Sequence, residues 1–162
     1  MIPLICGFPG VGKSYFAKHI QEMGVEVLDS DSSKWAKDQG WPHGYVHQLR
    51  QEVYNPNGPH PWVRPWNKLV LASTHEEVLE SLEVLGVPYV LVYPTLDAKT
   101  IYLQRYRDRG SSDAFIQTLD ANWEIWIKAL MLRTGNPHVI LTPNQHLTDL
   151  AHLLVGGEAE VQ

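Results

Sequence analysis

Residues 7–14 of the sequence read GFPGVGKS, which matches the pattern G-x-x-x-x-G-K-[ST] at every fixed position. A short apolar run, residues 2–6, precedes this stretch, and a helical pattern follows it. Glycines at such a turn allow successive backbone N–H groups to point inward, and the start of the helix adds its positive dipole end. The stretch therefore predicts a loop that binds nucleotide phosphates, and the alternative is a glycine turn that only joins a strand to a helix.

Two side chains of this loop have specific expected roles. Lys13 can reach the β- and γ-phosphates of a nucleotide, and the hydroxyl of Ser14 can ligate Mg²⁺. We therefore expect ATP and Mg²⁺ to bind here. The expected nucleotide contacts form one continuous stretch: Phe8, Pro9, Gly10, Val11, Gly12, Lys13, Ser14 and Tyr15.

Short apolar runs alternate with helical patterns along the chain. The apolar runs, which predict buried strands, are residues 2–6, 25–28, 68–72, 89–93 and 138–141. The helical patterns between and after them cover residues 13–24, 73–86, 96–110, 111–135 and 144–154. This alternation predicts an α/β domain in which a parallel sheet carries helices on both faces. We expect one domain over residues 1–155 and a loose tail over residues 156–162.

The composition excludes several classes of protein. The chain has 162 residues and a formal charge of −5, so a basic surface that holds an extended duplex is not expected. No stretch approaches the roughly twenty apolar residues that a membrane helix needs, and the amino end has no basic region typical of a signal peptide. A single cysteine excludes an internal disulfide and suits a reducing compartment. We expect a cytoplasmic protein with no membrane partner.

Three residues are predicted to lie in the core. Cys6 falls inside the first apolar run. Trp123 and Trp126 belong to a series of apolar residues that recurs at helical spacing within residues 111–135. For these residues packing is the expected role.

Asp29 and Asp31 follow the second apolar run, at the sheet edge where ligands of such folds bind. One carboxylate can hold Mg²⁺ together with Ser14, and we assign this metal role to Asp29. The other can orient an acceptor hydroxyl and take its proton. The alternative is helix capping by Asp31 or Ser30. Because no acid follows the third run before Glu76, an acid at this edge has to come from the aspartate pair.

The sequence RYRDRG places Arg105, Arg107 and Arg109 at the end of a helical pattern, before a small polar loop. Arg105 and Arg109 are four residues apart, which predicts that they share one helix face and clamp the phosphoryl group in transfer. We expect residues 105–115 to act as a lid. The alternative is a solvated basic helix end that complements the helix dipole.

Residues 32–67 are the expected substrate-binding region. Within them, residues 54–66 contain four prolines, which exclude regular structure. A nucleobase can stack on Trp35, and Arg50 and Arg64 can hold an acceptor phosphate, with Asp31 beside them. For any single tryptophan here, packing is the competing explanation.

With these motifs, the chain resembles the small P-loop kinases of the nucleoside monophosphate kinase superfamily, which includes the shikimate kinase-like enzymes. GFPGVGKSYFA (7–17) is a typical opening of that family, LDSDSSKW (28–35) resembles the shikimate kinase turn, and RYRDRG (105–110) resembles the arginine-bearing lid. Residues 71–127 are similar to small kinase-like proteins that bacteriophages carry.

This resemblance implies a three-layer P-loop NTPase fold with a five-stranded parallel sheet in the order 2-3-1-4-5. It also implies that Gly10, Gly12, Lys13 and Ser14 bind ATP and Mg²⁺. The expected catalytic residues are Lys13, Asp29, Asp31, Arg105 and Arg109.

Three functions remain open from the sequence. The first is an ATP-dependent kinase that transfers the γ-phosphoryl group to a (deoxy)nucleoside monophosphate. The second is a hydroxyl-directed kinase that acts on a polynucleotide 5′-end, a hydroxymethylated DNA base or a small metabolite. The third is a nucleotide-binding regulatory module without catalysis.

Overall fold

The computed structural model describes residues 2–30, 40–57, 60–62 and 68–150. Three of the predicted site residues, Asp31, Trp35 and Arg64, lie outside these ranges. The predicted tail, residues 156–162, also lies outside them. All structural statements below concern the described residues.

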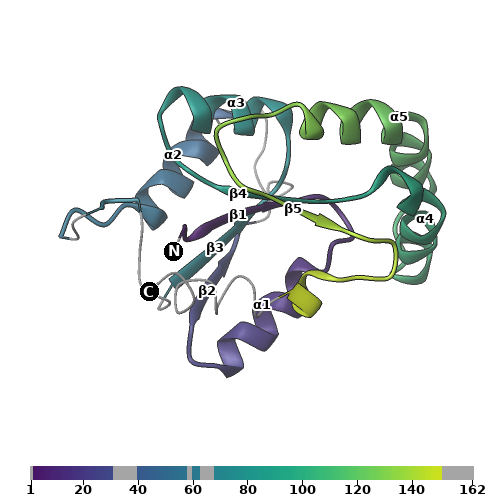
Figure 1. The fold of residues 1–162 in the computed structure, drawn as a ribbon, viewed down its shortest axis with the longest axis horizontal. Helices are drawn as coiled ribbons and strands as arrows, with labels where there is room; N and C mark the ends of the chain where they lie inside the picture. The colour runs from purple at the N-terminus through teal and green to yellow at the C-terminus, as the bar shows by residue number, and fades with distance from the viewer. Residues whose placement is uncertain (1, 31–39, 58–59, 63–67, 151–162) are drawn as a thin grey trace.

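Five parallel strands form one sheet in the order β2-β3-β1-β4-β5, as Figure 1 shows. The strands are β1 (Leu4–Gly7), β2 (Glu26–Asp29), β3 (Lys68–Ala72), β4 (Val90–Pro94) and β5 (His138–Leu141). Every strand pair is parallel, so the carboxyl ends of all strands meet at one edge of the sheet. The α/β class and the strand order expected from the sequence are confirmed.

Helices cover both faces of this sheet. They are α1 (Lys13–Glu22), α2 (His43–Val53), α3 (Glu76–Val84), α4 (Lys99–Asp108) and α5 (Asp113–Met131), with the short 3-10 helices η2 (Leu96–Ala98) and η3 (Leu147–Leu150). In Figure 1, α1 lies below the sheet, and α3 and α5 lie above it. Among the described helices, none has the length and apolar character to cross a bilayer.

Helix α2 lies within residues 32–67, the predicted substrate-binding region, where no helical pattern marks its position in the sequence. Its buried side chains are Tyr45, Val46, Leu49 and Val53, which recur at the spacing of a single helix face. Glycine and histidines interrupt this pattern in the sequence, and burial on β3 and α3 stabilises the helix. An ion pair between Lys68 Nζ and Glu52 Oε2, 2.6 Å long, joins the end of α2 to the start of β3.

Cys6 is fully buried in β1, which confirms its place in the core. Burial raises the pKa of its thiol to about 12. The group therefore stays protonated and unreactive at neutral pH.

The two tryptophans of α5 differ in burial. Trp123 is 2% exposed, donates from Nε1 to the Leu96 carbonyl at 2.9 Å, and meets the Phe8 ring edge-on at 5.4 Å. Trp126 is 39% exposed, so the prediction that it lies in the core is wrong. Three residues advance a helix by about 300°, which turns Trp126 to the border of the buried face, and Ile127 takes the inward position.

This difference predicts unequal costs of truncation. Trp123→Ala is expected to lower the free energy of unfolding by about 3–5 kcal/mol, because it leaves a cavity between α5 and the sheet. Trp126→Ala is expected to cost less than about 1 kcal/mol. Urea unfolding followed by circular dichroism measures both, and equal losses would contradict the assignment.

Candidate functional site

The glycine loop between β1 and α1 has the shape of an anion nest. Gly10 and Gly12 have φ of 91° and 93°, and the N–H of Val11 donates to the Phe8 carbonyl at 3.2 Å. No described side chain caps the start of α1, so its first-turn N–H groups face the loop without a side-chain acceptor. The helix dipole favours an anion at this position.

The residues predicted to contact the nucleotide differ in the exposure of their side chains. Phe8 and Val11 are buried, so these two residues can contact a nucleotide mainly through their backbone. Tyr15 is 70% exposed on α1. The loop therefore presents backbone amides and the side chains of Lys13 and Ser14 to a ligand.

Gly10 is required for steric reasons as well as for its φ. A Cβ at this position would lie 2.9 Å from Tyr106 and 3.0 Å from Tyr102, both on α4. Gly24 has a similar φ of 87°, but nothing lies within 4 Å of a Cβ there. A side chain at Gly24 would therefore cause backbone strain alone, whereas a side chain at Gly10 would cause backbone strain and steric overlap.

We therefore expect Gly24→Ala to cost about 1–2 kcal/mol of unfolding free energy and Gly10→Ala to cost more. The Gly10 substitution should also weaken ATP binding, because the loop has to move away from α4. Chemical unfolding and calorimetric titration with ATP measure these effects. If both substitutions cost the same and leave ATP affinity unchanged, α4 does not constrain the loop.

Lys13 lies at the centre of the carboxyl edge of the sheet. Its Nζ donates to the Gly7 carbonyl at 2.9 Å and lies 3.5 Å from the Ala72 carbonyl. These carbonyls end β1 and β3, so the ammonium group lies directly in front of two central strands. The aliphatic part of Lys13 lies so close to Gly7 that a Cβ there would be 2.9 Å from Cδ.

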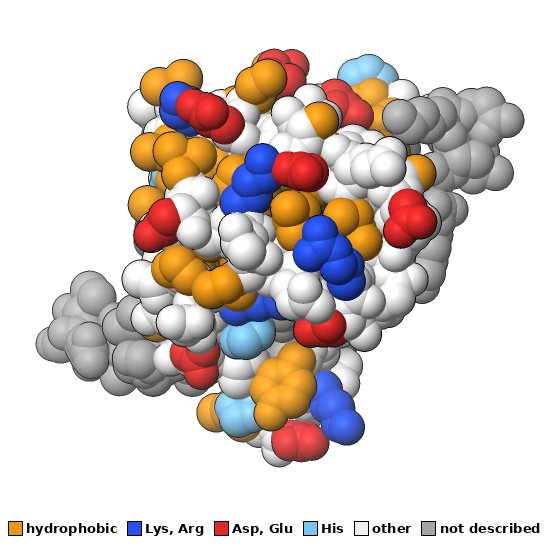
Figure 2. Space-filling view, turned by 90° about the vertical axis from the view of Figure 1, so that its right-hand side faces the viewer, with side chains coloured by type: hydrophobic (Ala, Val, Ile, Leu, Met, Phe, Trp, Pro, Cys, Tyr) orange, Lys and Arg blue, Asp and Glu red, His pale blue; other side chains and the backbone are white. Residues whose placement is uncertain are grey.

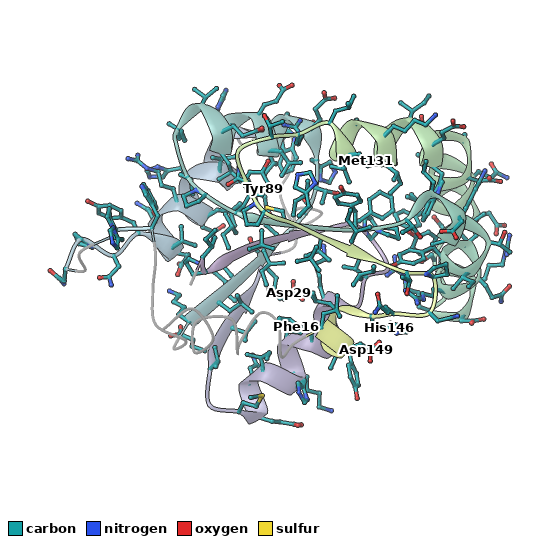
Figure 3. All side chains as sticks on the ribbon, in the orientation of Figure 1. Phe16, Asp29, Tyr89, Met131, His146 and Asp149 are labelled. Atoms are coloured by element: carbon teal, nitrogen blue, oxygen red, sulfur yellow. The ribbon has the colours of Figure 1, made fainter. Side chains whose placement is uncertain are left out.

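Ser14 and Asp29 form the candidate metal site. Ser14 Oγ lies 3.5 Å from Asp29 Oδ2, and Asp29 is the last residue of β2 (Figure 3). A hydroxyl and a carboxylate are oxygen donors of the kind that Mg²⁺ prefers, with water and phosphate oxygens as the remaining ligands. The described residues contain no cluster of three or more His, Cys, Asp or Glu with metal-binding geometry. The donor set therefore fits Mg²⁺ held together with a nucleotide.

The two predicted arginines do not converge on one point. Arg105 donates from Nη1 to the Gly10 carbonyl at 2.9 Å and from Nη2 to the Pro143 carbonyl at 3.0 Å. Arg109 lies 4.9 Å from the centre of the Tyr106 ring and donates from Nε to Ser111 Oγ at 3.0 Å. Both arginines belong to the predicted lid, but Arg105 contacts the outside of the glycine loop, while Arg109 contacts Tyr106 and Ser111 at the end of α4.

A pocket of about 280 Å³ opens beside Lys13. One wall comes from the loop and the end of β3, a second from the start of α3, and a third from the end of α5 and the residues after it. The lining residues in this order are Phe8, Pro9, Lys13, Ser73, Thr74, His75, Glu76, Glu77, Trp126, Ala129, Leu130 and Arg133. The volume lies near the lower limit for a small-molecule site.

The α3 side of this pocket is held by a small polar network. Ser73 Oγ and His75 Nδ1 lie 2.8 Å apart, and Trp41 Nε1 donates to Glu77 Oε1 at 3.0 Å. The Trp41 ring also meets the His75 ring edge-on at 5.3 Å. Trp41 thereby links the segment before α2 to the start of α3.

Two arginines differ from what the sequence predicts: Arg133 lines the pocket, and Arg50 does not. Arg133 forms an ion pair with Glu83 of α3, and no sequence signal identified it as a pocket residue. Arg50 lies on α2, with its guanidinium 5.9 Å from the centre of the Trp62 ring, and it does not line the pocket. Its substrate-binding role stays a prediction.

The end of the segment after β5 and the first residue of η3 lie against the glycine loop. The N–H of Leu147 donates to the Val11 carbonyl at 2.8 Å, and His146 lies 3.6 Å from the position of a Cβ on Gly12. Figure 3 shows His146 and Asp149 together at η3. Partial burial, and next the charge of Arg105, lower the pKa of His146, so its ring is neutral at pH 7.

No protein-family model matches the sequence, and a search of curated proteins finds no match. Solved structures match the fold. A gluconokinase from Sinorhizobium meliloti 1021 superposes with a TM-score of 0.55 at 13% identity, covering 99% of this chain and 94% of that one. A shikimate kinase from Bacteroides thetaiotaomicron superposes with a TM-score of 0.50 at 12% identity, covering 98% and 97%. At such low identity these likenesses establish the fold, and this chain has the three-layer α/β fold of these two P-loop kinases.

Proposed function

We propose that the protein is an ATP-dependent phosphotransferase that moves the γ-phosphoryl group of ATP to a small acceptor. The observation that carries this proposal is the position of Lys13, whose ammonium group lies between the glycine loop and the 280 Å³ pocket. A phosphoryl donor in the loop and an acceptor in the pocket would meet at this side chain. The fold shared with a gluconokinase and a shikimate kinase supports the same class of reaction.

In this proposal the loop amides and Lys13 bind the β- and γ-phosphates, and Ser14 and Asp29 hold Mg²⁺. The metal ion supplies charge neutralisation on the triphosphate when it is bound. Arg109, in the lid of residues 105–115, is an exposed side chain whose guanidinium lies over the rings of Tyr106 and Phe115, and it would reach a phosphate by leaving these rings. We keep Arg109 as the candidate for stabilising the transferred group.

The acceptor that we propose first is a (deoxy)nucleoside monophosphate. Its base would pack between Pro9 and Trp126, which line the pocket from the loop and from α5, and its phosphate would face Lys13. An acceptor phosphate is already ionised and needs no general base.

A specific observation favours a second candidate, a hydroxyl acceptor. The contact between Ser14 and Asp29 supports a metal role for Asp29, which leaves Asp31 as the candidate base. A hydroxyl acceptor benefits from such a base, whereas a monophosphate does not. A polynucleotide 5′-end, a hydroxymethylated DNA base or a small metabolite would use this arrangement.

The surface at the carboxyl edge of the sheet supports a small substrate. Figure 2 shows this side of the molecule, where Lys and Arg side chains alternate with acidic, apolar and uncharged groups. Extended duplex binding requires a continuous basic surface, which this face does not present.

The proposal is tested with purified protein, labelled ATP and Mg²⁺. The acceptor panel contains ribo- and deoxynucleoside monophosphates, hydroxyl-ended oligonucleotides, DNA with hydroxymethylated bases, gluconate and shikimate. We expect Mg²⁺-dependent transfer of label to one class. ATP binding without any labelled product would contradict the transferase and favour a regulatory module.

Asp31→Asn separates the two acceptor classes. Loss of turnover by about two orders of magnitude or more, with ATP affinity intact, indicates a hydroxyl acceptor that needs a base. A loss of only a few-fold indicates a monophosphate.

A further inference from the structure

Three consecutive carbonyl groups of the glycine loop are held from outside the loop. The Tyr106 hydroxyl donates to the Pro9 carbonyl at 2.7 Å, and Arg105 Nη1 donates to the Gly10 carbonyl at 2.9 Å. The backbone N–H of Leu147 donates to the carbonyl of Val11, the next residue. Each of the three donors comes from a segment more than 90 residues away in the sequence.

These bonds fix the direction of the loop amides. A trans peptide unit carries its N–H opposite to its C=O, and the peptide bonds of this loop are trans. Holding the carbonyls of Pro9 and Val11 outward therefore turns the N–H groups of Gly10 and Gly12 away from the donors. The N–H of Val11 is used within the loop, where it donates to the Phe8 carbonyl.

Helix α4 is shaped to fit the loop. Tyr102, Arg105 and Tyr106 occupy positions i, i+3 and i+4, which lie on one face of a helix. The rings of Tyr102 and Tyr106 are fully buried against Gly10, and the Arg105 guanidinium lies 4.4 Å from the centre of the Tyr102 ring. Burial raises the pKa of Tyr106, so its hydroxyl remains a proton donor at every physiological pH.

We infer that Tyr106 and Arg105 are positioning residues, which orient the amides of the phosphate loop before a nucleotide binds. The inference rests on the proposed function in one respect, namely that the loop binds phosphates. Preorganised donors bind an anion more tightly than donors that have to rotate into place. Arg105 would act here through the loop, because its guanidinium bonds to the Gly10 and Pro143 carbonyls.

The chain provides a matched pair of variants. Tyr106→Phe removes the hydroxyl that holds Pro9 and keeps the ring. Tyr102→Phe removes a hydroxyl from the same face of α4, one turn earlier, and that buried hydroxyl lies beside Arg105 and bonds to no loop carbonyl among the described residues. The two changes are chemically identical, and only one of them releases a loop carbonyl.

Calorimetric titration of the full chain with a Mg²⁺-bound non-hydrolysable ATP analogue, and separately with tripolyphosphate, tests the inference. For Tyr106→Phe we expect an affinity roughly five- to tenfold lower for both ligands. Without the hydroxyl, the Pro9 carbonyl is no longer held, so the Gly10 N–H is no longer fixed in direction. Tyr102→Phe should stay within about twofold of the wild type. Arg105→Lys should resemble Tyr106→Phe, because a single ammonium group cannot bridge the Gly10 and Pro143 carbonyls as the planar guanidinium does.

A second readout distinguishes positioning from simple packing. The amide resonances of Gly10 and Gly12 in the unliganded protein should shift in Tyr106→Phe and stay in place in Tyr102→Phe. If the wild type binds the ligands and Tyr106→Phe binds them equally well, the inference is overturned and the proposed function stands. Equal binding by Tyr106→Phe overturns the inference even if the thermal stability of this variant is lower than that of the wild type. If the wild type binds neither ligand, the proposed function is overturned, and this inference with it.

Discussion

Lys13→Met is expected to lower phosphoryl transfer by about 10³-fold and to weaken ATP binding, with little change in the thermal unfolding midpoint. The ammonium group lies in front of β1 and β3, where the β- and γ-phosphates of a nucleotide in the loop would lie. Methionine keeps most of the aliphatic chain that covers Gly7 and removes the charge. Turnover is measured with labelled ATP and affinity by calorimetry.

Lys18→Met is the matched control, because Lys18 is exposed on the same helix, α1, and the change in charge is identical. It should leave turnover and affinity within about twofold of the wild type. If both variants lose the same activity, the effect comes from net charge and Lys13 has no special role.

Asp29→Asn is expected to lower turnover by about 10²–10³-fold and to raise the Mg²⁺ concentration needed for half-maximal rate. The substitution keeps the size of the side chain and removes the negative charge that faces Ser14 Oγ. A neutral amide is a weaker ligand for Mg²⁺ than a carboxylate, so the metal-bound triphosphate would be less well held. Turnover measured as a function of Mg²⁺ concentration checks both effects.

Glu26→Gln serves as the control for this change, since Glu26 is an exposed carboxylate at the other end of the same strand. It should not alter the Mg²⁺ dependence. Wild-type turnover and Mg²⁺ dependence in Asp29→Asn would remove Asp29 from the metal site.

The sheet could be predicted because buried parallel strands leave a local signal. The apolar runs at residues 68–72 and 138–141 coincide with β3 and β5, and the other three strands begin or end within two residues of their runs. Helix α2 carries a weaker local signal, with Gly44 near its start, and it is stabilised by contacts with α3 and β3. In the described part of the predicted helix over residues 144–154, residues 144–146 are not helical and only the 3-10 helix η3 forms.

Part of the candidate site follows from neighbouring residues in the sequence, and part of it depends on contacts between distant residues. The glycine loop could be predicted from eight consecutive residues, since the motif specifies its own geometry. The contact between Arg105 and Gly10 joins residues 95 positions apart, and no spacing rule reveals it. Helical periodicity indicates which face of α5 is buried but not where the buried face ends, so it places Trp126 in the core although the residue is 39% exposed.

The arrangement of the arginines has a particular physical cause. Arg105 lies over Tyr102 and Arg109 lies over Tyr106, so each guanidinium stacks on the tyrosine three residues before it. Arg109 is also the C-cap residue of α4 and turns toward Phe115 and Ser111 of the next segment. The four-residue spacing correctly indicates one side of the helix, but each side chain follows its own aromatic neighbour.

A crystal structure with a non-hydrolysable ATP analogue and Mg²⁺ tests the central claim most directly. The account predicts that the triphosphate lies in the loop of residues 7–14, with Lys13 Nζ in contact with its terminal phosphates and Mg²⁺ between the nucleotide and Ser14. An analogue bound elsewhere, or a loop without phosphate at saturating ligand, would contradict it.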